Sequence, residues 1–579
     1  MNIIRYTERK HTMKYTPDFV YNVKEFKSIR EMLETNCAEY PERPAFLFRE
    51  DGISVEISYS RLIDDVKAVA TCLCRMGLGG KHIAVTGKNS YYWAVTYLAV
   101  VCGVGVIVPI DKDLSEKEID FILEHSEADA VMISPELSEK FEGCANNVKK
   151  LYMSDIPEMF KNGRKYIEEG DESYKNHKVD PYGMSAILYT SGTTGVAKGV
   201  MLSQYNITSD IEHILRCVKV TSEDRSISVL PLHHTYECTI GFIAMLYCGA
   251  SIAYNDSLKT LKKDLAEYKP TIFVSVPIIL ERFHKLVKDK YNKIKGGNNI
   301  LAMQKFAAKI TNFDIRKKIF SAVGEAFGGK LRLILCGAAP LDPQIFRDYE
   351  LFGIKVYIGY GLTETAPVCL MHSDFYNCAD DNGYPMAGTY AKITDANAEG
   401  VGELAVKGPN IMLGYYKNPE ETEKVIRDGW FYTGDLATQN SINGTFKIVG
   451  RAKSMIVTPS GKKVFPEELE AVLGANELVE ECMVFGTEDT GKTIITASIY
   501  PNEEAVAAAL KKKGLSEDLA KEDPAEYEKE VKALLTAIIT EFNDNAPVYK
   551  VIKRLIVRKE EFVKTTTKKI KRNAEENLK

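Results

Sequence analysis

Paired cysteines are missing from this sequence. The chain of 579 residues contains twelve cysteines, but they are scattered and none forms a C-x-x-C motif. Cys72 and Cys74 lie two positions apart, without a second pair or a histidine at the spacing of zinc sites. The sequence therefore predicts neither a disulfide framework nor a zinc site. Buried thiols in a reducing compartment, such as the cytoplasm, are expected instead.

The chain also lacks an excess of charge of one sign. Its 75 Lys and Arg residues and 80 Asp and Glu residues give a formal net charge of −5. A general nucleic-acid-binding protein would need a strongly basic domain, so that class is disfavoured. Hydrophobic residues make up 45% and charged residues 27% of the chain, as in ordinary soluble proteins. At this length two or more domains are expected.

Long uninterrupted apolar runs are missing as well. The first residues, MNIIRYTERKHTMKY, are polar and charged, so no secretory signal is predicted. Residues 91–110, YYWAVTYLAVVCGVGVIVPI, carry no charge over twenty positions, which is long enough to span a bilayer. However, Gly103 and Gly105 interrupt the run, and its β-branched end stops at a proline turn. A buried helix followed by a buried strand is predicted, and the protein is expected to be soluble.

One loop is rich in glycine and hydroxyl groups, namely LYTSGTTGVAKGVMLS at residues 188–203. It fits neither G-x-x-x-x-G-K-[ST] nor G-x-G-x-x-G. Its glycines let the backbone turn so that N–H groups can point at an anion, and Lys198 adds a positive charge for phosphate oxygens. Since Gly, Ser and Thr are ordinary loop residues, a plain surface loop is the alternative interpretation.

Short β-type runs alternate with helical stretches over most of the chain. For example, TIFVSVP leads into IILERFHKLVKDKY, and LRLILCGAAP leads into LDPQIFRDYELFG and then IKVYIGYG. This alternation predicts an α/β fold with parallel sheets covered by helices, and ligands in the loops beyond the carboxyl ends of strands. After about residue 395, frequent glycines and alternating patterns predict smaller antiparallel β-structure. From Pro466 to Lys579, helix and strand signals return in a compact stretch.

The string YTSGTTGVAKGV resembles the phosphate-binding signature of the adenylate-forming superfamily, which includes acyl-CoA synthetases. Further motifs of that family follow in order, and the resemblance extends from about residue 27 to 572. YGLTETAPV and a long helical insert at 278–330 are most like those of bacterial long-chain fatty acyl-CoA synthetases. The resemblance implies a large N-terminal domain, 1–452, of helix-covered sheets with a distorted β-barrel subdomain. It also implies a small, mobile α+β C-terminal domain, 453–579.

YGLTET, at 360–365, follows a strand-like run. Thr363 offers a hydroxyl for phosphate and Glu364 a carboxylate for Mg²⁺, although a helix cap would use the same residue types. The resemblance assigns Thr363 and Glu364 these catalytic roles and places Tyr360 near the adenine. The ATP and AMP contacts expected in this part of the chain are Thr190, Ser191, Gly192, Thr193, Thr194, Gly195, Lys198, Gly337, Ala338, Ala339, Tyr360 and Gly361.

Two other loops concern the acid substrate and the adenine. LCGAAPLD, at 335–342, is small and glycine-rich, so that adenine and an acyl group could approach the backbone between Gly337 and Pro340. In LPLHHTYE, at 230–237, the resemblance makes His234 a catalytic candidate beside the carboxylate substrate. A metal site at the His-His pair would need a third ligand, and none lies at a suitable spacing.

WFYTGDLA, at 430–437, places Asp435 after a β-type run and a glycine turn. A carboxylate there can accept two hydrogen bonds from a ribose diol, as nucleotide-binding acids do in other folds. An ordinary Gly-Asp turn is the alternative. Arg451 can bridge ribose and phosphate oxygens, and Ile448 is a further nucleotide contact that the resemblance implies.

FVKTTTKKIKR, near the C-terminus, resembles the family's final signature. Register makes Lys569 the catalytic lysine, with Lys568 at the position where glycine is usual, so either lysine could be the one delivered. A basic tail is the alternative, because 551–579 holds ten Lys or Arg and four Asp or Glu and could contact anionic lipid. The resemblance also implies a hinge and a loop for the CoA step, at Lys453, Gly461 and Lys462.

The reaction implied by the resemblance needs no protein nucleophile, so the lack of a G-x-S-x-G elbow is no objection. A fatty acid attacks ATP, giving an acyl-adenylate and pyrophosphate, and the thiol of CoA then takes the acyl group. ATP, Mg²⁺, CoA and a fatty acid are the expected ligands, while a homodimer and peripheral contact with the inner face of the membrane stay open. Alternative functions are a fatty acyl-AMP or acyl-carrier-protein ligase, a CoA ligase for a shorter or aromatic acid, luciferase-type oxidation, and noncatalytic nucleotide binding.

Overall fold

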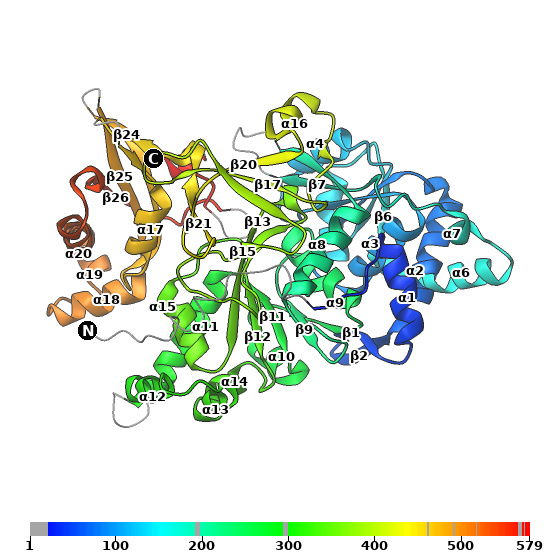
Figure 1. Ribbon diagram of the computed structural model, residues 1–579, viewed down its shortest axis with the longest axis horizontal. Coiled ribbons are helices and arrows are strands. Elements are labelled where there is room, and N and C mark those ends of the chain that lie inside the picture. The colour runs from blue at the N-terminus through cyan, green and yellow to red at the C-terminus, as the bar shows by residue number, and fades with distance from the viewer. Residues whose placement is uncertain are drawn as a thin grey trace. The chain divides into compact units, whose positions relative to one another are not determined.

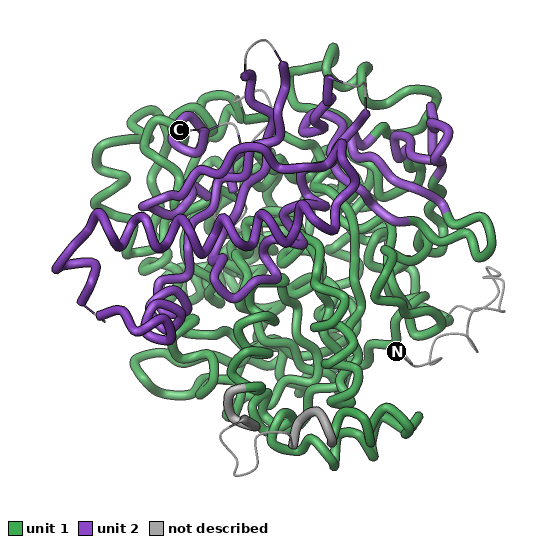
Figure 2. Tube along the Cα trace, turned by 90° about the vertical axis from the view of Figure 1, so that its left-hand side faces the viewer, with its two compact units in different colours: residues 1–391, 406–432, 440–446 green, residues 392–405, 433–439, 447–579 purple. Residues whose placement is uncertain are grey.

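A computed structural model of the chain describes residues 21–190, 197–292, 299–459, 462–489, 492–516, 518–564, 570–572 and 574–578. The chain divides into two compact units (Figure 2). Unit 1 contains residues up to 391 together with 406–432 and 440–446, and unit 2 contains 392–405, 433–439 and 447–579.

The larger sheet of unit 1 has nine strands, most of which run through the centre of the ribbon in Figure 1. From edge to edge they are β15 (Tyr384–Pro385), β14 (Val368–Met371), β13 (Lys355–Gly361), β12 (Leu333–Cys336), β11 (Ile272–Ser275), β9 (Arg225–Ser228), β10 (Ser251–Tyr254), β1 (Pro44–Glu50) and β2 (Ile53–Ser58). The pairings from β13 through β1 are all parallel. The predicted parallel sheet is therefore confirmed.

The second sheet of unit 1 has seven strands. In order they are β18 (Gly414–Tyr415), β8 (Lys198–Ser203), β7 (Met184–Thr190), β4 (Val106–Ile110), β3 (His82–Thr86), β5 (Ala130–Ile133) and β6 (Lys149–Tyr152). β7 and β8 are antiparallel, and so are β8 and β18. Strand β18 thus brings a segment from beyond residue 410 next to the glycine-rich loop.

The apolar run at 91–110 forms a helix and a strand, as predicted. Helix α3 (Tyr91–Gly103) begins where the Ser90 hydroxyl accepts a hydrogen bond from the Trp93 backbone N–H, and β4 follows it. Gly103 lets the helix pack closely, since a Cβ there would lie 2.4 Å from the Tyr174 ring. In the part of the chain that the structure describes, no helix is long and apolar enough to cross a membrane.

The predicted helical insert is also confirmed. It consists of α11 (Pro277–Asn292), α12 (Asn299–Ala307), α13 (Phe313–Ile319) and α14 (Ser321–Ala326). Apolar side chains from the insert, such as Phe320 and Phe327, pack into one core cluster with Phe273 of β11 and Phe346 of α15 (Pro343–Leu351). Helix α15 begins with Asp342, whose carboxylate accepts two backbone N–H hydrogen bonds.

Unit 2 contains the α+β structure predicted at the C-terminal end. Strands β24 (Val479–Asp489), β25 (Lys492–Pro501) and β26 (Ile552–Val557) form a three-stranded sheet, and its core includes side chains of α17 (Pro466–Gly474) and α20 (Pro524–Asn545). The β-structure predicted after about residue 395 is present as well, with some of its strands assigned to unit 1. Its strands are β16 (Tyr390–Thr394), β17 (Gly402–Lys407), β19 (Ile426–Arg427), β20 (Trp430–Gln439) and β21 (Phe446–Arg451). The domain boundary after residue 452 stays a prediction.

Candidate active site

Three of the predicted loops lie at one edge of the nine-stranded sheet. Strands β9, β11, β12 and β13 are successive parallel neighbours, so their carboxyl ends share that edge. The loop with His234 follows β9, the loop with Gly337 follows β12, and the turn with Glu364 follows β13. This placement agrees with the sequence expectation, whereas the roles of the residues stay predictions.

The glycine-rich loop connects the antiparallel strands β7 and β8. Thr190 ends β7 and pairs directly with Lys198, the first residue of β8. This pairing holds the two ends of the loop side by side. The five predicted contacts between these ends lie outside the described residues, namely Ser191, Gly192, Thr193, Thr194 and Gly195.

The ammonium group of Lys198 has two partners in unit 1. It lies 2.6 Å from a carboxylate oxygen of Glu421, in the first turn of α16 (Pro419–Val425), and 5.0 Å from the ring centre of Tyr415. Hydrogen bonds from Lys198 and Lys424 lower the pKa of Glu421 to about 2. Glu421 is therefore ionised at neutral pH. Its carboxylate pairs with the ammonium group of Lys198, for which a phosphate of ATP is the predicted partner.

Tyr415 links this lysine to the predicted metal ligand. Its hydroxyl donates a hydrogen bond of 2.9 Å to Oε1 of Glu364, and the backbone oxygen of Glu364 accepts one from the Met412 N–H. No described residue donates to Oε2 of Glu364, and the side chain is half-buried. A single carboxylate that shares Mg²⁺ with substrate phosphates is a common arrangement, so the group fits the ion.

Gly337 lies close to a tyrosine ring. A Cβ at this position would lie 2.9 Å from the Tyr236 ring, in a buried part of the loop. This contact gives a structural reason for glycine here, and the approach of adenine to this loop stays a prediction. Ala338, Ala339 and Pro340 are exposed, and the left-handed φ of +71° at Ala338 turns the chain at this point.

The two histidines after β9 contact one another. The ring centres of His233 and His234 are 4.2 Å apart, and Nε2 of His233 lies 3.5 Å from a carboxylate oxygen of Asp111. Over the described ranges, no group of three or more His, Cys, Asp or Glu side chains could hold a metal ion. The position of His234 at the sheet edge leaves it as a candidate for contact with the acid substrate.

Asp435 and Arg451 form an ion pair within unit 2. Nε of Arg451 lies 2.9 Å from Oδ1 of Asp435, which is almost fully buried. The predicted glycine turn before Asp435 is wrong, because β20 runs from Trp430 to Gln439 without a break. Gly434 has φ +72° inside the strand, and its N–H donates to the side chain of Glu403.

Comparisons with known proteins place this geometry in a family. The model of the AMP-binding enzyme family matches residues 33–416, and the model of the AMP-binding enzyme C-terminal domain matches residues 453–578. The chain belongs to the AMP-binding enzyme family.

Relatives in this family include enzymes named for fatty acids. The chloroplast long-chain-fatty-acid–acyl-carrier-protein ligase of Arabidopsis thaliana is 26% identical, over 85% of this chain and 78% of the relative. Long-chain-fatty-acid–CoA ligase 5 of Mus musculus is 28% identical, over 87% and 80%.

Solved structures show the same fold. The anthranilate CoA ligase AuaEII with anthranoyl-AMP has a TM-score of 0.73 at 18% identity and covers 96% of each chain. ATP-bound MatB from Rhodopseudomonas palustris has a TM-score of 0.72 at 23% identity, over 94% of this chain and 98% of MatB.

The remaining residues predicted for the site of this AMP-binding enzyme lie in several different motifs. Ile448 is half-buried in β21, Lys453 lies in the short turn Ala452–Ser454, and Lys462 is exposed. Tyr360 and Gly361 end β13. Gly461, Lys568 and Lys569 lie outside the described residues.

Sequence reasoning missed Tyr415 and Glu421 in this AMP-binding enzyme. Both belong to MLGYYKNPEETEKV, more than 200 positions after Lys198, and neither carries a motif that predicts phosphate chemistry alone. Their proximity to Lys198 arises only in the tertiary structure. Strand β18 pairs with β8, and this pairing places Tyr415 opposite Val200. Only that pairing brings the tyrosine between the lysine and Glu364.

Proposed function

We propose that this AMP-binding enzyme activates a long-chain fatty acid with ATP and transfers the acyl group to CoA. The products are acyl-CoA, AMP and pyrophosphate. The observation that carries the proposal is the linked arrangement of Lys198, Tyr415 and Glu364 in a chain whose relatives include a long-chain-fatty-acid–CoA ligase. A lysine and a magnesium-type carboxylate joined by one tyrosine suit the binding of a triphosphate.

In the first half-reaction a carboxylate oxygen of the fatty acid attacks the α-phosphorus of ATP. A new oxygen–phosphorus bond forms, the bond to the bridging oxygen breaks, and pyrophosphate leaves with the electron pair. Negative charge is spread over the phosphate oxygens, where the ammonium group of Lys198 and the hydroxyl of Thr363 stabilise it. Lys198 must leave Glu421 to do this, so ATP and Glu421 compete for the same ammonium group.

Mg²⁺ is proposed as the metal of this step, with Glu364 as its protein ligand. When bound, such an ion neutralises charge on the phosphates. Tyr415 then has a positioning role, since its hydroxyl fixes one oxygen of Glu364 and leaves the other toward the ion. His234 lies after β9 at the same sheet edge and would contact the carboxylate of the acid.

In the second half-reaction the thiolate of CoA attacks the carbonyl carbon of the acyl-adenylate. A carbon–sulfur bond forms and AMP leaves with the electrons of the carbon–oxygen bond. An acyl-carrier protein carries the same pantetheine thiol. The chloroplast relative of this chain is named for that acceptor, which makes transfer to a carrier protein the second candidate function.

Pyrophosphate release from MgATP tests the proposal. The acids are acetate, benzoate and fatty acids of C8 to C18, each measured without acceptor, with CoA and with a carrier protein bearing phosphopantetheine. Multiple turnovers only with CoA and a C12 to C18 acid are expected. Turnover only with the carrier protein would favour the second candidate, and a preference for acetate or benzoate would contradict a long-chain substrate.

Glu364→Gln serves as the inactive variant in this assay. It keeps the size of the side chain and its hydrogen bond from Tyr415, but it removes the charge that Mg²⁺ needs. ATP binding without pyrophosphate release for every acid, in the wild-type protein, would contradict an enzymatic function altogether.

A further inference from the structure

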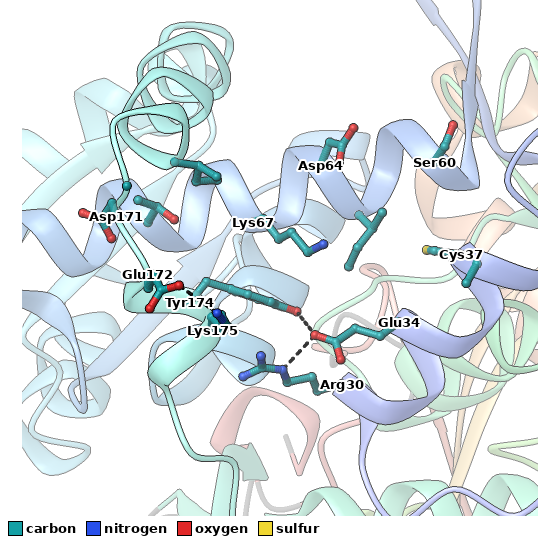
Figure 3. Close-up of a pocket in the computed structure, with 15 residues that line it drawn as sticks. Arg30, Glu34, Cys37, Ser60, Asp64, Lys67, Asp171, Glu172, Tyr174 and Lys175 are labelled. Atoms are coloured by element: carbon teal, nitrogen blue, oxygen red, sulfur yellow. Dashed lines mark hydrogen bonds and ion pairs between the residues drawn. The ribbon is translucent and has the colours of Figure 1, made fainter.

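A cavity of about 780 Å³ lies in unit 1 outside all the motifs discussed so far. It is a groove between α1 (Ile29–Glu39) and α2 (Tyr59–Leu73), closed by the segment that joins α6 (Ile156–Glu168) to α7 (Ser173–Asn176) (Figure 3). Its size is in the range of sites that hold a small organic ligand. None of the residues predicted to bind ATP, the acid or CoA lines it.

The two long helices each present one face to the groove. On α2 this face consists of Ser60, Ile63, Asp64, Lys67 and Thr71, which are three or four positions apart. On α1 it consists of Arg30, Glu34, Cys37 and Ala38. The groove therefore has a floor built from two regular elements rather than from loops.

Most charges around the groove neutralise one another. Arg30 pairs with Glu34 at 2.9 Å, and Lys175 pairs with Glu172 at 2.7 Å. Asp171, also in the lining, is paired with Arg75 outside it at 2.7 Å. Asp64 and Lys67 are the charged lining residues that lie outside these pairs. The groove is therefore not suited to a ligand with several charges.

Lys67 is the unusual group in this lining. It is half-buried, and it makes no ion pair or hydrogen bond with any residue in the described ranges. Figure 3 shows its ammonium group pointing into the groove toward α1, and Asp64 lines the same groove three positions earlier on α2. The ammonium group of Lys67 is therefore available to pair with an anion that enters the groove.

Thr71 supplies a second unsatisfied group, one helical turn beyond Lys67. Its side chain is fully buried, and its hydroxyl has no hydrogen-bond partner among the described residues. Thr71 and Lys67 line the groove from the same face of α2, one helical turn apart, so one ligand group can reach both. A carboxylate has two oxygens, so one can take the ammonium group and the other the hydroxyl.

The remaining lining is largely apolar. Ala38, Ile63 and Ile167 supply aliphatic walls, and Cys37 is buried beside them. Burial raises the pKa of the Cys37 thiol to about 12, so it stays neutral and adds to the apolar wall. A ligand that fits all of these groups has one negative charge and an apolar body.

We propose that this groove is a second ligand site, separate from the catalytic motifs, that binds a small monocarboxylate with an apolar body. Lys67 pairs with the carboxylate, Thr71 donates to its other oxygen, and the apolar body lies along Ile63 and Cys37. No residue predicted for the catalytic reaction lines this groove. Its ligand class overlaps the acids proposed as substrates, so the test reads binding at Ile63, a residue of the groove, and needs no turnover.

Methyl NMR of the full chain, without ATP or CoA, tests this site directly. The probe is sodium decanoate, kept below the concentration at which it forms micelles, and the readout is the δ1 methyl signal of Ile63, assigned with Ile63→Val. A saturable shift of this signal is expected. Absence of a saturable shift would overturn the proposal.

Matched variants separate binding at Lys67 from binding elsewhere. Lys67→Gln is expected to raise the Kd from the Ile63 signal at least fivefold. Lys117→Gln, an exposed lysine of α4 (Glu116–His125) without an ion pair in the described ranges, should leave it unchanged. Decanamide, which lacks the charge, should bind the wild-type protein as weakly as decanoate binds Lys67→Gln. The same Kd in Lys67→Gln and wild type would contradict the proposal.

Thr71→Val provides a second test that does not change charge. Since the hydroxyl has no partner among the residues that the structure describes, this isosteric change should not lower the melting temperature. It is expected to raise the Kd for decanoate two- to fivefold. An unchanged Kd would exclude Thr71 from the site.

Discussion

Lys198 forms an ion pair with Glu421 when no nucleotide is bound. The pair lies on strand β8 and helix α16, and both side chains are more than two-thirds buried. An ion pair of this kind typically contributes about 1 kcal/mol or less, which a triphosphate can easily exceed. Glu421 is therefore a competitor that keeps the lysine ordered.

Replacing Glu421 by Gln should lower the KM for ATP about two- to fivefold, the size of effect expected from a partly exposed ion pair. The reason is that ATP no longer has to displace a carboxylate. Steady-state pyrophosphate release at varied ATP measures this. Glu420→Gln, an exposed neighbour on the same helix, is the charge-matched control. A higher KM in Glu421→Gln would mean that Glu421 orients Lys198 instead of competing for it.

The same pair also predicts a pH dependence. Hydrogen bonds from Lys198 and Lys424 lower the pKa of Glu421 from 4.5 to about 2 in the folded state. A carboxyl group whose pKa is lower in the folded than in the unfolded state stabilises the fold at pH values above its unfolded pKa. This stabilisation is lost as the pH falls through the folded pKa. Between pH 5 and 9 the ratio of KM values for wild type and Glu421→Gln should therefore stay constant. A ratio that changes across this window would point to another titrating group.

Tyr415 is expected to act through Glu364. Tyr415→Phe removes the 2.9 Å hydrogen bond to the carboxylate, so the Mg²⁺ concentration for half-maximal rate should rise about tenfold, as for other partners of metal ligands. A magnesium titration at saturating ATP measures the change. Tyr416→Phe, which loses a hydrogen bond to the exposed Glu127, is the control and should not shift the titration. An equal effect of both variants would argue against a role for Tyr415 at the metal.

At the scale of elements, the loop after β12 depends on the close approach of Gly337 to Tyr236. Gly337→Ala places a Cβ about 2.9 Å from the buried ring, so the free energy of unfolding should fall by about 1 to 3 kcal/mol. Thermal unfolding measures this loss. Gly324→Ala, on helix α14 where nothing lies within 4 Å of the added Cβ, should be neutral or stabilising. A similar loss in both variants would show that crowding at Tyr236 is not the cause.

Most elements were predictable from local pattern, and the exceptions have identifiable causes. The helix at Tyr91–Gly103 follows from a local apolar run and its Ser90 cap, whereas the helical insert was predicted from the family resemblance. The strand at Trp430–Gln439 was predicted to end in a turn, because Gly-Asp normally marks one. Within this strand Gly434 has φ +72°, and its N–H donates to the side chain of Glu403, a residue of another strand, which the local Gly-Asp pattern does not encode.

At the scale of the whole molecule, Lys453 is the predicted hinge between the two half-reactions. Lys453→Pro fixes one backbone dihedral and should leave adenylate formation intact while it slows thioester formation about tenfold or more. Single-turnover assays of each half-reaction measure the two rates. Lys453→Ala removes the same charge but leaves the backbone free, so it should behave like wild type. An equal loss in both half-reactions would contradict the hinge.

The sequence by itself determined the family, the alternation of strands and helices, and the loops that carry the motifs. These depend on short strings and on periodicity, which are properties of neighbouring residues. Only the tertiary structure revealed Tyr415 and Glu421 beside Lys198, Tyr236 against Gly337, and Lys67 unpaired in its groove. Each of these contacts joins segments distant in the chain or depends on which side chains surround a position, and no local pattern encodes that.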